Sequence, residues 1–264
     1  MDNQANPALI QKGEPTRAPL FLIHDAGGTV SHYYKLDKIG RPVYTIHNPW
    51  FKAETKWDGG SMTFVNEYIK LIKSVVPSGE IIVGGWSLGG QLAIDIARVL
   101  AQNSRSRLRV VGLVLVDTMY PYWGPPDTVH AEFPVDLVLK NCPPDIKENM
   151  IRCMQWSKQD SDEWVSRNWK TDDNSGLDGI EAMVPPDAVL LHAQKYVPVA
   201  DPQTASRCMV DYLRDDKVGW NHFPHQFIAA VWEMPTHHFG LFEKTTVRET
   251  TEKIRRACDL LAED

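Results

Sequence analysis

The stretch that links a predicted strand to a predicted helix reads Ile81-Ile82-Val83-Gly84-Gly85-Trp86-Ser87-Leu88-Gly89-Gly90. Residues 81–84 are typical of a buried strand, and a helix with one apolar face begins at Leu88. A strand that passes into a helix through Gly-x-Ser-x-Gly is the context of a nucleophile elbow. Because Gly85 and Gly89 have no side chains to clash in this tight turn, we expect Ser87 to be strained and its hydroxyl to face a cleft. The stretch predicts a serine nucleophile; the alternative interpretation is a plain glycine-rich turn.

Other apolar runs extend this pattern along the chain. Six runs bounded by turn-forming residues are predicted strands: 20–24, 43–47, 81–84, 110–116, 188–192 and 227–233. Because the runs are almost continuously apolar, they indicate strands buried on both faces, as in a parallel sheet. Helical spacing follows a possible cap at Ser61, recurs from Leu88 and returns after Thr246. The alternation predicts an α/β fold with a mostly parallel, doubly wound sheet.

Residues 118–187 interrupt the alternation of strands and helices. They contain three Pro-Pro pairs and 13 acidic against 6 basic residues. They also contain four of the nine tryptophans: Trp123, Trp156, Trp164 and Trp169. We expect residues 1–264 to form a single domain in which 118–187 are an insertion that makes a helical lid over an apolar cavity. The alternative is that the four tryptophans fill a small second core.

Composition excludes several classes of protein. The chain has 28 Lys and Arg against 34 Asp and Glu, a net charge of -6, which makes nucleic acid an unsuitable partner. It lacks the run of roughly 18 to 20 apolar residues that spans a membrane, and residues 1–12 lack a signal-peptide core. We therefore expect a soluble, cytoplasmic protein without a membrane partner. The four cysteines are widely spaced, so we expect neither a metal site nor a disulfide framework.

A serine nucleophile needs an imidazole to take its proton and a carboxylate to orient that imidazole. Two histidines, His237 and His238, follow the last predicted strand, and one of them should be the base. For the acid, Asp117 ends the fourth predicted strand, at the edge of the sheet where sites gather. Asp201 follows the next strand by a loop and is the competing acid. Position alone favours Asp117.

The tetrahedral intermediate of such a serine enzyme needs two amides to hold its oxyanion. The first is the amide of Leu88, at the positive end of the helix that begins there. The second should come from the loop 24–28 after the first predicted strand, where small residues let the backbone approach a substrate. Ala26 is the expected donor, with Gly27 as the close alternative. The first two residues of this loop point in different directions and are not expected to act as an acid–base pair.

Four segments together resemble a known family: residues 20–28, Gly85-Trp86-Ser87-Leu88-Gly89-Gly90, Val116-Asp117 and His238-Phe239-Gly240-Leu241-Phe242. The chain is similar, over nearly its whole length, to thioesterase domains of polyketide and nonribosomal peptide synthetases, especially fungal polyketide synthases, within the α/β hydrolase superfamily. The resemblance implies Asp117 as the acid and, because the family's base directly precedes Phe, His238 as the base. It also implies a helical lid between the two. His237 is an addition to the motif and stays an alternative base.

The resemblance implies a function as well. The expected enzyme is a thioesterase that takes a polyketide-type acyl chain from the phosphopantetheine of an acyl carrier protein and binds it as an ester on Ser87. Hydrolysis, or transfer to an alcohol, amine or enol carbon, would release the product. The expected partner is the carrier protein or a parent synthase, and no bound cofactor is expected. Two rival functions remain: a carboxylesterase for small diffusible esters, and a non-catalytic ligand-binding protein of the same fold.

Overall fold

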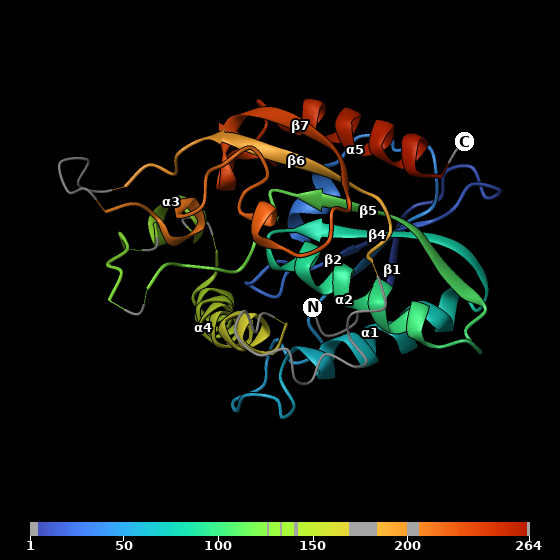
Figure 1. Ribbon diagram of the computed structural model, residues 1–264, viewed down its shortest axis with the longest axis horizontal. Coiled ribbons are helices and arrows are strands. Elements are labelled where there is room, and N and C mark those ends of the chain that lie inside the picture. Colours follow the sequence, from blue (N-terminus) through green and yellow to red (C-terminus); the bar gives the residue numbers. More distant parts are fainter. Residues whose placement is uncertain are drawn as a thin grey trace.

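A seven-stranded sheet runs through the centre of the computed structural model, which describes residues 5–125, 127–132, 134–139, 142–168, 184–199 and 206–262 (Figure 1). The strands lie in the order β1-β3-β2-β4-β5-β6-β7, and all neighbours are parallel except β1 and β3. The strands are β1 (Ala8–Gln11), β2 (Leu20–Ile23), β3 (Val43–Ile46), β4 (Gly79–Trp86), β5 (Leu108–Val116), β6 (Ala188–Lys195) and β7 (Ile228–His237).

Helices cover both faces of this sheet. The α-helices are α1 (Ser61–Val75), α2 (Leu88–Gln102), α3 (Val135–Leu139), α4 (Pro144–Asn168) and α5 (Val247–Leu261). Short 3-10 helices are η1 (Ser31–Lys35), η2 (Met209–Asp211), η3 (Trp220–His222) and η4 (His238–Gly240). Helices α1 and α2 lie on one face and α5 on the other, whereas α3 and α4 lie beyond the ends of β4 and β5 (Figure 1).

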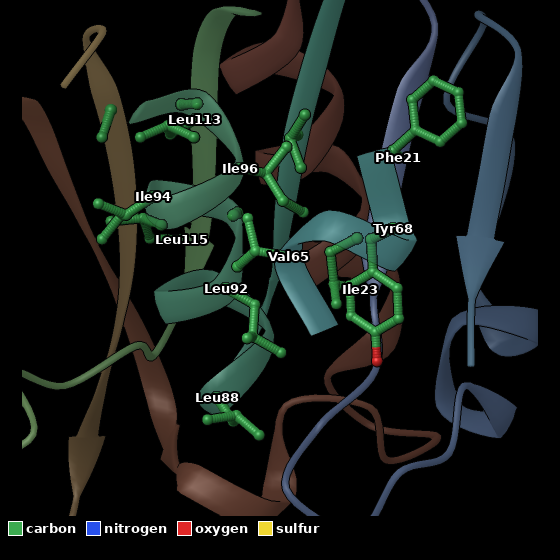
Figure 2. Packing of buried hydrophobic residues seen from close by; sticks show 14 of the residues in the cluster. Phe21, Ile23, Val65, Tyr68, Leu88, Leu92, Ile94, Ile96, Leu113 and Leu115 are labelled. Carbon is green, nitrogen blue, oxygen red and sulfur yellow. The ribbon is translucent and has the colours of Figure 1, made fainter. Parts of the chain in front are cut away.

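Each face of the sheet has its own apolar core. Phe21 and Ile23 of β2 pack with α1 and α2, where Tyr68 and Leu92 are also buried (Figure 2). The alternate residues of the same strands pack with α5 on the opposite face, around the buried Ile254. Side chains of a strand point alternately to the two faces, so a strand with helices on both sides must be apolar throughout. This double burial is the reason for the continuous apolar runs.

The predicted α/β fold is confirmed, with differences in detail. All six predicted strands and the three predicted helices are present. The sequence reading missed β1, because a four-residue antiparallel edge strand with Leu9 exposed leaves little apolar signal. It also ended the last strand too early, since β7 continues to His237. Ser61 is the first residue of α1 and not its cap, a position that Gly60 takes with a φ of 61°.

The segment between β5 and β6 contains α3 and α4 in its described part. Trp123 lines a cavity beside these helices, Trp156 packs edge to face on Trp57 at 5.3 Å, and Trp164 is buried in the core that contains α2. Trp169 lies outside the described residues. All three described tryptophans of this segment therefore lie in the main core or pack against it. The division of the chain into one domain with a lid at 118–187 stays a prediction.

We predict that Gly84→Ala destabilises the fold more than Gly112→Ala. A Cβ at Gly84 would lie 2.2 Å from the carbonyl oxygen of Val114, in the backbone of the neighbouring central strand. A Cβ at Gly112 would meet a side chain and not the backbone, that of the partly buried Leu261 at the end of α5. Urea denaturation should show a loss of about 3 kcal/mol for Gly84→Ala and about 1 kcal/mol for the control. Equal losses of stability in the two variants would mean that Gly84, within the sheet, is packed no more tightly than Gly112.

Candidate active site

Ser87 occupies a strained turn between β4 and α2. Its φ of 55° and ψ of -121° are unfavourable for a residue with a side chain. A Cβ on Gly85 would lie 2.6 Å from the backbone of Gly89, and a Cβ on Gly89 would lie 2.5 Å from the carbonyl oxygen of Ile23. The Ser87 amide donates to the carbonyl of Val116 at 3.0 Å. The two glycines therefore let α2 start directly against β2, and this close approach keeps Ser87 in its strained conformation.

Asp117 and His238 form a buried hydrogen-bonded pair. Nδ1 of His238 donates to Oδ2 of Asp117 at 2.8 Å, and the two side chains are 2% and 0% exposed. The other carboxylate oxygen of Asp117 accepts the amide of Ala193 at 2.8 Å. The imidazole also lies beside the Trp86 ring, with centroids 5.1 Å apart. Because Nδ1 is the donor in this pair, Nε2 of His238 is the nitrogen left to accept a proton.

The alternative residues lie elsewhere. His237 is the last residue of β7, its Nδ1 has no hydrogen-bond partner within the described chain, and burial lowers its pKa. It is His238, and not His237, that meets Asp117. Asp201 lies outside the described residues. The structure thus brings two of the three expected side chains into direct contact.

A cavity of about 460 Å³ connects Ser87 with His238 of this pair. Ser87 and His238 both line it, although the hydrogen bonds of the described residues do not include one between them. Such a bond is often long before substrate binds. Most of the wall is apolar and includes Leu88, Met119, Trp123, Val138, Ile151, Met154, Val210 and Phe239. An apolar ligand with one reactive polar group fits this lining.

The expected oxyanion donors lie on the same cavity. Ala26 and Leu88 both line it, and the hydrogen bonds recorded for the described residues leave their amides unused. Leu88 begins α2, so the positive end of that helix points to the cavity. Gly27, the alternative donor, is a lining residue too. The carbonyl of Ala26 accepts the hydroxyl of Ser157 at 3.3 Å, which connects this loop to α4.

Helix α4 is attached to the body of the protein through buried polar groups that the sequence reading missed. Ser161 donates to Gln91 at 3.2 Å, and the indole of Trp164 donates to Asp95 at 3.0 Å. Asp160 accepts the indole of Trp57 at 2.9 Å and pairs with Lys56 at 2.9 Å. With Ser157, these α4 residues are spaced by three and four, which places them on one helix face. This spacing in the sequence could have predicted a polar helix face that binds the body of the protein.

The loop after β2 contains a second group of buried polar side chains. Nδ1 of His24 bonds to the carbonyl of Asp25 and Nε2 to the hydroxyl of Tyr68, while burial lowers its pKa to about 4. His24 is therefore a neutral structural residue. Burial raises the pKa of Asp25 to about 7, although backbone amides from Thr29 and its neighbours favour the charged form. His32 lies 3.9 Å from this carboxyl, and burial lowers its pKa to about 3.

The described residues contain neither a cluster of metal-ligating side chains nor a membrane-spanning helix. Among them, no three His, Cys, Asp or Glu side chains are grouped to hold a metal. None of the four cysteines forms a disulfide, and three of them are buried. No helix in the described ranges combines the length and the apolar character needed to cross a bilayer.

Comparison with known proteins identifies relatives of the whole chain. A family model described as "Thioesterase domain" matches residues 18–132. The probable thioesterase gloN of Glarea lozoyensis is 32% identical over 97% of this chain and 98% of its own length. Thioesterase frbD of Dothideomycetidae sp. is 35% identical, with coverage of 97% and 94%. The crystal structure of the NocB thioesterase domain, a covalent complex with a fluorophosphonate nocardicin G analogue, has a TM-score of 0.61 at 17% identity, over 92% of this chain and 95% of that one. The fold is that of thioesterase domains of the α/β hydrolase type, as expected from the sequence.

We predict that Asp25→Asn makes stability less dependent on pH. A carboxyl whose pKa is about 7 when folded and 3.8 as a reference stabilises the fold in its protonated form. This contribution is complete below about pH 4 and is lost as pH rises through about 7, by at most about 4 kcal/mol. Urea denaturation at about pH 5 and about pH 8 should therefore show a smaller fall for the variant than for the parent chain. An unchanged fall would mean that Asp25 is ionised throughout.

Proposed function

This chain belongs to the thioesterase family, and we propose that it releases a polyketide-type acyl chain from an acyl carrier protein through an ester on Ser87. One observation supports this most strongly. The Asp117–His238 pair, joined at 2.8 Å, opens onto the same apolar cavity as a serine with a φ of 55°. An oriented base beside an exposed hydroxyl is what nucleophilic acyl transfer needs.

The first half of the proposed reaction forms the acyl enzyme. Nε2 of His238 takes the proton of Ser87 as Oγ attacks the carbonyl carbon of the thioester. Asp117 keeps the imidazole in the required tautomer and stabilises its positive charge. When the tetrahedral intermediate collapses, the carbon–sulfur bond breaks and His238 returns the proton to the leaving thiol. The acyl chain is then an ester of Ser87.

The oxyanion of that intermediate is assigned to the amides of Ala26 and Leu88. Both amides are unused in the free protein and both belong to residues of the cavity wall. A donor of this kind contributes about 3 to 4 kcal/mol to the transition state, because it is oriented before the charge develops. The close contact between α2 and β2 fixes the distance between the two donors.

The second half of the reaction releases the product. Water, an alcohol, an amine or an enol carbon attacks the ester, His238 takes the proton of the acceptor, and Ser87 leaves with that proton. The apolar wall of the cavity supports an acyl chain as the bound group, and α4 limits the access of water to it. The carrier protein, free or within a parent synthase, would bring the chain on its phosphopantetheine. The enzyme itself would need no cofactor.

We predict that the protein hydrolyses an N-acetylcysteamine or carrier-bound acyl thioester with a higher kcat/KM than an aryl ester of the same acyl chain. A fluorophosphonate probe should add its mass to Ser87. Ser87→Ala should lose the labelling and at least about a thousandfold in turnover, because removal of a triad member usually costs more than that. The unchanged circular dichroism spectrum of the variant is the control. A faster aryl ester would indicate a carboxylesterase, and failure to label the folded protein would indicate a ligand-binding protein.

We predict that His238→Ala is as damaging as Ser87→Ala, whereas His237→Ala, a matched neighbour, loses less than about tenfold. Of these two neighbouring histidines, it is His238 whose imidazole bonds to Asp117. Asp117→Asn should cost about 10⁴ in kcat through loss of the correct tautomer. The rates of acyl-enzyme formation, followed by intact mass, measure these effects. If His237→Ala were the inactive variant, the base would have been assigned to the wrong histidine.

A further inference from the structure

Arg214 places a guanidinium between two buried carboxylates. Its Nη1 lies 3.9 Å from Oδ2 of Asp117 and 3.6 Å from Oδ1 of Asp211. The arginine side chain is 7% exposed, and both carboxylates are 0% exposed. Charges removed from water to this degree are stable only beside opposite charges. The three side chains therefore form one electrostatic unit that contains the proposed catalytic acid.

The other nitrogen of this guanidinium supports the strand beside Asp117. Nη2 of Arg214 donates to the carbonyls of Ala193 and Lys195, the latter at 3.2 Å. These two residues flank the irregularity in the pairing of β6 with β7. The amide of Ala193 in turn donates to Oδ1 of Asp117 at 2.8 Å. Arg214 thus binds the carbonyl of Ala193, the same residue whose amide orients the Asp117 carboxylate.

Asp211 completes the group and is itself fixed in place. Its Oδ2 accepts the amide of Val197 at 2.7 Å, while its Oδ1, which faces Arg214, has no hydrogen-bond partner in the described chain. Burial raises the pKa of Asp211, Asp117 adds to this effect, and the Val197 amide, Arg214 and His238 oppose it. Asp211 therefore lies within electrostatic reach of His238.

We propose that Arg214 and Asp211 are positioning residues that set the orientation and the electrostatic environment of the Asp117–His238 pair. The inference rests on the proposed roles of Ser87, Asp117 and His238. Arg214 holds the β6 amide against the acid and places a positive charge 3.9 Å from its carboxylate. Asp211 balances that positive charge, so that the imidazolium formed during catalysis is not destabilised by the arginine.

The opposite charges of the two residues make the proposal testable through pH dependence. Removal of Arg214 takes away a cation that repels the imidazolium, so the acidic limb of the pH profile should move to higher pH. Removal of the Asp211 charge should move it to lower pH. Other titratable groups face this pair or its neighbours: His192, Lys195, Asp215, Glu233, His237 and Glu243. The two substitutions leave all of these in place.

The experiment measures kcat/KM for an acyl thioester, and the rate of fluorophosphonate labelling, as functions of pH. We expect the midpoint of the acidic limb to move to higher pH by about half to one unit in Arg214→Gln and to lower pH by a similar amount in Asp211→Asn. Arg214→Gln should also lose at least tenfold in kcat with little change in KM. Arg214→Lys keeps the positive charge but loses the forked guanidinium that bonds to two carbonyls. Its acidic limb should therefore stay near the pH of the parent chain's limb, while kcat falls.

A matched control is Arg41→Gln. Arg41 is fully buried and pairs with Asp259 at 3.1 Å, but it bonds to the carbonyl of Ala18, at the amino ends of the strands and away from the site. Its substitution should lower stability to urea and leave the acidic limb unchanged. This comparison separates the loss of a buried arginine from the loss of Arg214.

The inference would be overturned if the acidic limb of the pH profile stayed in place in both variants. It would also be overturned if the limb moved in the same direction in Arg214→Gln and Asp211→Asn. If Arg214→Gln does not fold, the test rests on Asp211→Asn, in which the side chain keeps its shape. The acidic limb of this variant must then move to lower pH, and an unshifted limb would overturn the inference. In both cases Ser87→Ala would still be inactive. An active, labelled Ser87→Ala would instead refute the proposed function, so the two failures are distinguishable.

Discussion

The close approach of α2 to β2 is the contact on which the geometry of the site depends. Side chains are missing at Gly85 and Gly89, and a Cβ on Gly89 would touch the carbonyl oxygens of Ile23 and His24. Because the helix begins this close to the strand, Ser87 is kept at a positive φ, where it points into the cavity. The same contact places the first amide of α2 beside the loop after β2. The proposed nucleophile and the proposed oxyanion donors thus share one steric constraint.

The order of the strands explains how residues distant in sequence meet. Ser87 follows β4 and Asp117 follows the adjacent β5, so two carboxyl ends supply the proposed nucleophile and the proposed acid. His238 follows β7, two strands from β5, and is 121 residues from Asp117 in the chain. The strand between them, β6, bridges the gap, because its Ala193 amide binds the free oxygen of Asp117. Rigid strands therefore fix each partner of the pair, as expected where ligands bind at the carboxyl edge of an α/β sheet.

Much of this arrangement could be predicted, and the reasons differ between residues. The central strands are buried on both faces, so their apolar runs were unambiguous, and the glycines of the elbow have a local steric role. The strand β1 has neither property. Arg214 and Asp211 lie in an irregular segment around η2, where no periodicity relates a residue to its neighbours in space. Their contacts with Asp117 arise from the folding of that segment onto β6. The strand pattern alone leaves the choice between His237 and His238 open, because a shift of one residue turns a side chain to the other side of the chain, and it was the resemblance to thioesterase domains that favoured His238.

Helix α4 shows how polar and apolar faces divide their roles at the cavity. Its polar face makes hydrogen bonds to Ala26, Gln91 and Asp95, and such bonds are costly to leave unmade once buried. Two apolar residues of the same helix, Ile151 and Met154, lie on the cavity wall beside Ser157 and Ser161. Dispersion contacts are not directional, so apolar side chains can be exchanged for others of similar size without moving the helix. The polar bonds therefore fix the position of α4 relative to Ser87, and under the proposed function the apolar residues would determine the shape of the acyl chain that fits.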